Sequence, residues 1–174
     1  MSAIRPITPG DAPVLAQLLR DSRDFLAPWE PARSEDYFTA DGQRAFISRA
    51  LAHREQGAGF PYAILGESGR VAGRINLNDV VRGPFQSASL GYWVNAADNG
   101  RGLATAAVRE IIGLAFGKLG LHRIQAGTLP HNVRSQRVLA RNGFTRIGLA
   151  PAYLRIEGRW QDHLLYQLVA AVPG

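Results

Sequence analysis

A glycine-flanked loop that runs directly into a helix is the feature that most constrains the fold. Residues 98–112 read DNGRGLATAAVREII, with Gly100 and Gly102 on either side of Arg101. Glycine is used where the backbone takes a positive φ or where another group approaches the chain closely. The helix that follows offers unpaired N–H groups and the positive end of its dipole. The segment therefore predicts an anion site at the start of a helix.

Several known loop types combine glycines with a helix. A P-loop requires a Lys-Ser/Thr pair after its glycines, and none follows here. A dinucleotide fingerprint requires a third glycine, where Thr105 stands, and a repeated βαβ pattern that the chain lacks. Two interpretations stay open on this segment alone. One is a plain strand-to-helix turn, and the other is a cradle of backbone N–H groups for the pyrophosphate of coenzyme A.

Apolar periodicity and turn residues predict strands and helices in the order β-α-α-β-β-β-α-β-α-β-β, a mixed α/β fold. Strands are expected at 2–8, in a hairpin over 60–81 that turns at 67–70, and at 86–94, 122–127, 144–148 and 162–170. Helices are expected after a cap at Asp11, and over 34–56, 102–118 and 131–142. The segment YLRIEGRW, between the last two strands, is expected to contain a glycine turn.

Length and composition indicate one ordinary globular domain over residues 1–174. No cysteine is present, which excludes disulfides, thiolate metal sites and a cysteine nucleophile. Neither a membrane span nor a signal peptide is indicated, so a cytoplasmic protein is expected. The net charge is +6, but Lys118 is the only lysine and the arginines are scattered. Specific nucleic-acid binding is therefore not expected, although phosphate ligands would be attracted.

Two segments together resemble the signatures of one enzyme family. Asn99–Ala104, NGRGLA, resembles the (Q/R)-x-x-G-x-(G/A) signature of the GCN5-related N-acetyltransferase (GNAT) family, with Asn99 where the family has Gln or Arg. Further on, Asn132–Phe144, NVRSQRVLARNGF, resembles the family's second signature, an asparagine that opens a helix ending in Gly-Phe. The resemblance covers most of the chain from about residue 60. It favours the coenzyme A cradle over the plain turn.

The resemblance implies a single-domain GNAT-like fold with a mixed, mostly antiparallel central sheet flanked by helices. It also implies acetyl-CoA as the co-substrate and no metal. Backbone amides of the loop would hold the pyrophosphate, and a strand that splays near Val94 would admit the acetyl group and polarise its carbonyl. The residues assigned to coenzyme A are Trp93, Val94, Asn99, Gly100, Arg101, Gly102, Leu103, Ala104, Thr105 and Asn132.

Acyl transfer also needs a proton for the departing thiolate. Asn132 has the donor and acceptor that a pantetheine amide requires, and it equally suits a helix N-cap. Ser135 lies on the same helix face, and the resemblance implies that it is the catalytic proton donor to the sulfur. An exposed helical serine with no catalytic role is the alternative. Leu139, where many relatives have a tyrosine donor, cannot donate a proton.

The sequence does not identify a general base. Ala152 stands where related sequences carry a carboxylate. The remaining candidates carry no distinguishing signal: Glu35, Asp36, Asp79, Glu157, Asp162, His131 and His163. An α-amino group has a pKa of about 7.7–8.0 against about 10.4 for lysine, so a protein N-terminus would need less help to lose its proton.

The last predicted hairpin of the chain narrows the class of acceptor that is expected. Tyr153–Leu168 resembles the ribosomal-protein-alanine N-acetyltransferase (RimJ/RimL-like) branch, and LAPW at 26–29 resembles the loop that lines its acceptor site. The resemblance implies Trp29 and Tyr153 at the substrate site and a protein α-amine as acceptor, such as a ribosomal protein N-terminus. It also implies a monomer or homodimer. A small-molecule amine acetyltransferase and a non-catalytic acyl-CoA-binding domain are the alternatives.

Overall fold

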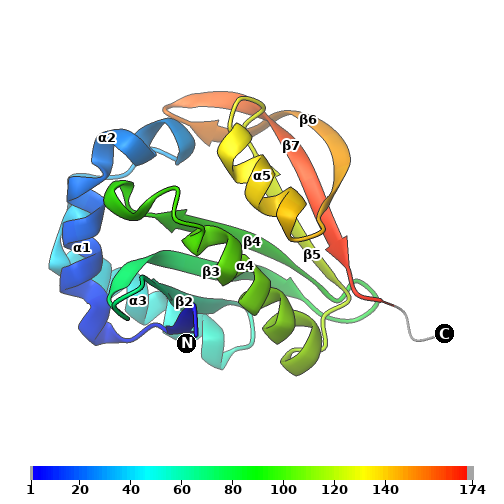
Figure 1. Ribbon diagram of the computed structural model, residues 1–174, viewed down its shortest axis with the longest axis horizontal. Helices are drawn as coiled ribbons and strands as arrows, with labels where there is room; N and C mark the ends of the chain where they lie inside the picture. The colour runs from blue at the N-terminus through cyan, green and yellow to red at the C-terminus, as the bar shows by residue number, and fades with distance from the viewer. Residues whose placement is uncertain (1, 172–174) are drawn as a thin grey trace.

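The computed structural model describes residues 2–171, which form a seven-stranded sheet with helices on both faces (Figure 1). The strand order is β1-β2-β3-β4-β5-β7-β6. All neighbours pair antiparallel except β4 and β5, which pair parallel. The strands are β1 (Ile4–Pro6), β2 (Phe60–Leu65), β3 (Val71–Val81), β4 (Ser87–Val94), β5 (Arg123–Thr128), β6 (Thr145–Ile156) and β7 (Arg159–Val169).

The α-helices divide between the two faces of this sheet. The first face carries α1 (Ala12–Asp21) and α3 (Ala40–Glu55), and the other carries α4 (Leu103–Gly113) and α5 (Val133–Arg141). A short helix α2 (Arg23–Leu26) and a 3₁₀ turn at Ala27–Trp29 continue from α1. Further 3₁₀ turns lie at Pro9–Asp11, Glu35–Phe38 and Ala96–Asp98, and a π-helical turn at Leu114–Lys118 extends α4.

Each face of the sheet has its own apolar layer. Ile75 and Ile124 on the sheet pack with Val108, Ile111 and Leu139 beneath α4 and α5, and all five are fully buried. The opposite layer joins Trp93 to apolar side chains of α1 and α3, including Leu15, Leu19 and Ile47. Burial of such side chains contributes about 1.5–3 kcal/mol each, so both layers fix the strands that carry the site.

The two central strands, β4 and β5, pair along a short stretch and then diverge. Pairing between β4 and β5 consists of Ser87 with Arg123, Ala88 with Ile124, and Ser89 with Gln125. Beyond Ser89, β4 continues to Val94 without a further partner on β5 in the described chain. A V-shaped opening follows at the ends of these two strands, as the family resemblance implied.

Most predicted elements are confirmed, and the largest correction concerns the last hairpin. The segment YLRIEGRW contains the predicted glycine turn, but the strands on both sides are longer than predicted, because β6 runs on to Ile156 and β7 begins at Arg159. The turn itself is Glu157-Gly158, both with positive φ. The helix predicted from residue 34 is also shorter, since α3 begins at Ala40 after a 3₁₀ turn and Thr39 Oγ1 accepts the Gly42 N–H.

Asp11 stands at the N-cap position of α1, as predicted, but it does not make the capping bond to that helix. Its carboxylate instead accepts the backbone N–H of Thr8 at 2.8 Å and pairs with Arg5 at 2.6 Å. Burial alone would raise the pKa of Asp11, and these hydrogen bonds outweigh it and lower the pKa. The residue therefore fixes the turn between β1 and α1.

Candidate active site

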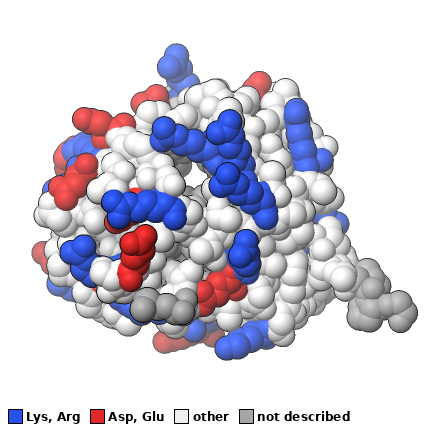
Figure 2. Space-filling view, viewed as in Figure 1, with Lys and Arg blue, Asp and Glu red and all other residues white. Residues whose placement is uncertain are grey.

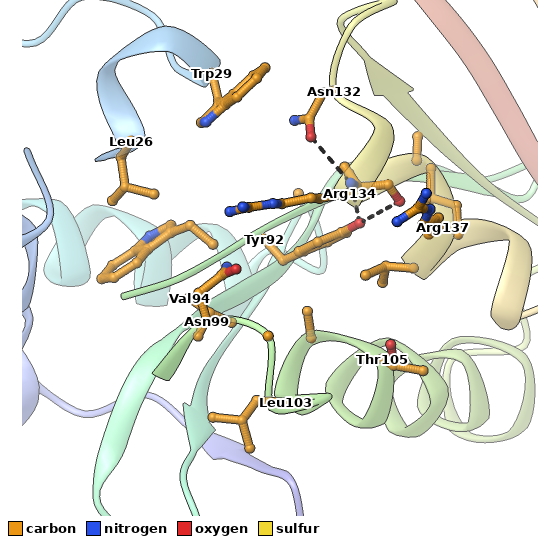
Figure 3. Close-up of a pocket in the computed structure, with 18 of the residues that line it drawn as sticks. Leu26, Trp29, Tyr92, Val94, Asn99, Leu103, Thr105, Asn132, Arg134 and Arg137 are labelled. Atoms are coloured by element: carbon orange, nitrogen blue, oxygen red, sulfur yellow. Dashed lines mark hydrogen bonds between the residues drawn. The ribbon is translucent and has the colours of Figure 1, made fainter. Parts of the chain in front are cut away.

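A cleft of about 730 Å³ lies at the opening between β4 and β5 (Figure 3). Three sets of elements line it: the end of β4, the glycine loop with the start of α4, and α5. The 3₁₀ turn after α2 contributes Trp29 and Glu30 from the opposite side. The segments that the two signatures singled out, 30 residues apart, therefore meet across one cavity.

The glycine loop has the backbone conformation that its sequence predicts. Gly100 and Gly102 have φ of +83° and +81°, which L side chains rarely adopt. The Ala106 N–H donates to the Gly102 carbonyl at 3.0 Å, so α4 starts there and the N–H groups of 103–105 have no partner within the helix. A Cβ on Gly100 or Gly102 would meet no protein atom within 4 Å. The loop amides thus border open space.

Most residues that the sequence assigned to coenzyme A line this cleft. They are Trp93, Val94, Asn99, Gly100, Gly102, Leu103, Ala104, Thr105 and Asn132. Arg101 is the exception, because its side chain is exposed outside the lining and lies 3.6 Å from Asp98. The contact that the loop offers an anion therefore comes from the backbone.

Asn132 begins α5 and caps it. Its Oδ1 accepts the Ser135 N–H at 3.2 Å, while the residue also lines the cleft (Figure 3). The N-cap function and a position in the cleft therefore coexist, as the sequence allowed. The cap also fixes Ser135, because the same hydrogen bond holds its backbone at the first turn of the helix.

Ser135 has a partner that the sequence analysis did not predict. Its Oγ lies 2.8 Å from the Tyr92 hydroxyl, which reaches across from β4. Burial raises the pKa of Tyr92 to about 12, and the hydrogen bond to Ser135 works in the other direction. Tyr92 therefore keeps its proton at neutral pH. Both hydroxyls lie in the cleft as a pair that can donate a proton.

The arginines of α5 form a cationic wall that sequence reasoning also missed. Arg134, Arg137 and Arg141 all line the cleft. Figure 2 shows arginine side chains gathered over α5 beside the hollow, and Figure 3 shows Arg134 extending across it. A sequence signal was present, since a spacing of three and four residues places all three on one helical face. This wall suits the phosphates of coenzyme A.

The opposite wall carries an aromatic ring and a carboxylate. Trp29 stacks at a tilt on His131, with 5.3 Å between ring centroids. Glu30 follows Trp29, and burial raises its pKa although Arg33 and Arg74 partly oppose that effect. Among the described residues that line the cleft, Glu30 and Asp98 are the acidic ones, and Asp98 accepts a hydrogen bond from Asn95 in the loop turn. Glu30 is thus the carboxylate on the wall that also carries Trp29.

Tyr153, the other residue that the sequence assigned to the acceptor, is not among the residues that line the cleft. Tyr153 is 52% exposed and packs against His163, whose ring is buried. Both side chains border Gly127, which does line the cleft. None of the base candidates considered from the sequence is among the lining residues. Asp162, for example, accepts the Ala152 N–H at 2.8 Å and holds a bulge in β6.

Comparisons with known proteins agree with this geometry. Residues 3–145 match the model of the family described as the acetyltransferase (GNAT) domain. The chain is 37% identical to the Probable N-acetyltransferase YjcK of Bacillus subtilis over 92% of this chain and 89% of the relative. It is 36% identical to the [ribosomal protein uS5]-alanine N-acetyltransferase of Escherichia coli over 95% and 86%. Mycobacterium smegmatis RimJ, solved in complex with CoA-disulfide, superposes with a TM-score of 0.92 at 33% identity over 96% and 81%.

The chain therefore belongs to the GNAT acetyltransferase family, as its two signatures indicated. It is an acetyl-CoA-dependent N-acetyltransferase, and the expected resemblance to the ribosomal-protein-alanine branch is confirmed. Within residues 2–171, no three of His, Cys, Asp and Glu gather in a way that would hold a metal ion. None of the helices in that range is long and apolar enough to cross a bilayer.

Proposed function

We propose that this enzyme acetylates the N-terminal α-amine of a protein or peptide, with a ribosomal protein N-terminus as the favoured acceptor. The observation that carries the proposal is the division of charge across the cleft. Arg137 and Arg141 of α5 line one side, where coenzyme phosphates would bind, Trp29 and Glu30 line the other, where an amine would bind, and Arg134 extends between them. The E. coli relative that matches 95% of the chain acts on the alanine of ribosomal protein uS5, which supports the same acceptor class.

In this proposal the loop amides and Asn132 hold the coenzyme, and a free N–H of β4 near Val94 polarises the thioester carbonyl. Glu30 binds the acceptor ammonium and takes one proton from it, and the neutral amine then attacks the thioester carbonyl. The Ser135 and Tyr92 hydroxyls return a proton to the departing thiolate. Their 2.8 Å separation allows Tyr92 to replace the proton that Ser135 gives up, and the second proton that the acceptor nitrogen loses after its attack restores the Tyr92 hydroxyl. Leu139, which stands where many relatives have a tyrosine donor, is fully buried and takes no part in this relay.

The acceptor class also suggests where the enzyme works. Ribosomal proteins are present in the cytoplasm, so we propose that the enzyme works in that compartment. Three of the basic residues that give the chain its positive charge form the cationic wall of the cleft, namely Arg134, Arg137 and Arg141. This supports the view that the charge serves phosphate binding without specific nucleic-acid recognition.

Mass spectrometry of a peptide panel tests the acceptor. Peptides that begin with Ala or Ser are compared with the same peptides blocked at the N-terminus but carrying a free lysine, and with small amines. We expect acetylation of the free α-amine alone. Modification of the blocked lysine peptides would overturn the proposal, as would consumption of a small amine while both peptide sets stay unmodified.

A further inference from the structure

A second cavity, which we name the basic pocket, lies beside the acetyl-transfer cleft. It encloses about 480 Å³, and its polar lining is Arg33, Ser34, Arg49, His53, Asn76 and Asn78. No aspartate or glutamate of the described chain lines it. Two arginines and a histidine around one cavity favour an anion.

Aromatic rings line one side of the basic pocket, which we call its floor, and they orient a cation of the pocket. Arg33 lies over the ring of Tyr37, with the guanidinium carbon 4.7 Å from the ring centroid. Phe46 and Phe60 complete the floor. Cation–π contact of this kind restricts the guanidinium to one side of the cavity without neutralising its charge.

A buried cation behind the floor strengthens the positive potential. Arg74 is 4% exposed, lies 4.0 Å over the Phe46 ring and donates to the Tyr37 hydroxyl at 3.1 Å. Its Nε and Nη1 have no hydrogen-bond partner among the described residues. Burial of a cation with unpaired N–H groups is costly. Glu30, the carboxylate whose pKa Arg74 lowers, offsets part of that cost, and an anion held nearby would offset more.

Paired residues on two neighbouring strands, β3 and β4, line the basic pocket and the cleft respectively. Gly91 lines the cleft, and its cross-strand partner Asn76 lines the basic pocket. A Cβ on Gly91 would lie 3.5 Å from Asn78 Nδ2, so the side chain of this basic-pocket residue also reaches Gly91 of the cleft. The segment from Glu30 to Ser34 borders both, with Glu30 in the cleft and Arg33 in the pocket.

From this arrangement we infer that the basic pocket is a specificity subsite for an acidic side chain of the acceptor, a few residues after the acetylated N-terminus. Neighbouring strands lie about 4.8 Å apart and an extended chain advances about 3.3 Å per residue, so β4 to β2 corresponds to about three residues. The subsite therefore reads Asp or Glu at about the third or fourth acceptor position. This inference rests on the proposed function, since it needs a peptide acceptor in the cleft.

A matched peptide series tests the subsite. Peptides that begin with Ala and carry Glu, Gln or Lys at positions three and four are compared by kcat/KM. The Glu peptides are expected to be the best substrates and the Lys peptides the worst. In the Arg33→Glu/Arg49→Glu double variant the preference for Glu over Gln is expected to fall about three- to tenfold. Arg44→Glu, a single Arg→Glu replacement on α3 outside the pocket, should keep the wild-type ranking.

The outcomes separate the two proposals. Equal kcat/KM for the three peptides, or a ranking that the double variant leaves unchanged, overturns the subsite while acetylation of the Gln peptide still supports the proposed function. If no peptide accepts acetyl, the proposed function fails, and calorimetry with N-acetylated Glu and Lys peptides decides the subsite directly. Tighter binding of the Glu peptide, lost in the double variant, supports it, and equal binding overturns it.

Discussion

Tyr92 and Ser135 share one hydrogen bond, so loss of either hydroxyl leaves the other without its partner. We expect Ser135→Ala to lower kcat by about ten- to a thousand-fold with little change in KM for acetyl-CoA, because proton donation matters only in the transition state. Tyr92→Phe should also lower kcat. If the proton passes along the pair, the double variant should be hardly worse than Ser135→Ala alone.

Steady-state kinetics of the three variants provide the measurement. Ser48→Ala, which removes a hydroxyl from the exposed side of α3, serves as the control and should keep full activity. Wild-type kcat in the double variant would remove both hydroxyls from the mechanism.

Glu30 offers a pH-dependent prediction at the same scale. Burial raises its pKa above the usual 4.5, with Arg33 and Arg74 opposing the shift. A base works only when deprotonated, so kcat/KM should fall as the pH drops through this raised pKa. In Glu30→Gln we expect this acidic limb to disappear and kcat/KM to fall about ten- to a thousand-fold at neutral pH. The limb due to the acceptor α-amine, near pH 7.7–8.0, should persist in both enzymes.

A matched variant separates the Glu30 carboxylate from general charge effects. Glu35 is exposed outside the cleft and pairs with Arg23, which lowers its pKa. Glu35→Gln is therefore expected to keep the wild-type pH profile. An acidic limb that survives in Glu30→Gln would assign it to another group.

At the scale of elements, the loop before α4 is defined by two left-handed glycines. We expect Gly102→Val to weaken coenzyme A binding by about 5- to 150-fold, because a φ of +81° strains any L side chain by about 1–3 kcal/mol and the loop relaxes away from its cradle. Calorimetry measures the affinity, and circular dichroism checks that the fold persists. Gly69→Val imposes the same strain at φ +74° in the β2–β3 turn and should leave the affinity unchanged. Equal affinities in wild type and Gly102→Val would refute the cradle.

The elements that sequence reasoning predicted well are those with short-range signals. The strand, glycine loop and helix over 86–118 depend on positive φ and on helical periodicity, both local properties. Asn132 was recognisable for the same reason, since a cap is formed within one helical turn. The β2–β3 hairpin was predictable in the same way, because its predicted turn at 67–70 contains Gly69, whose N–H donates to the Gly66 carbonyl.

The features that were missed depend on contacts between distant segments. Most of β6 is exposed at the sheet edge and lacks the alternation that identifies a half-buried strand, so its length was underestimated. The partner of Ser135 is Tyr92, 43 residues away on β4, where its side chain looks like any core aromatic. Glu30 became a candidate base only because the turn after α2 folds it against the cleft, and neither propensity nor motif predicts that burial.

At the scale of the whole molecule, the cleft lies between two parts of the sheet, β1 to β4 and β5 to β7, which are connected by few backbone pairs. β4 and β5 share only the residue pairs from Ser87 to Ser89, while β3–β4 and β6–β7 pair over most of their length. The glycine loop belongs to the first part and α5 to the second, and both line the same cleft. A ligand that contacts both should therefore connect them more firmly than the sheet does alone.

Thermal unfolding with and without coenzyme A tests this coupling. At a hundred times Kd a ligand stabilises the folded state by about 2.7 kcal/mol. For a chain of this size that corresponds to a Tm increase of about 5–11 °C. Hydrogen exchange should show new protection both at the start of α4 and along α5 and β5, because the ligand bridges the opening. Gly102→Val at the same coenzyme concentration should show a smaller shift. Protection confined to the α4 side would mean that the coenzyme does not reach across to α5, and the arginines of that helix would then need another role.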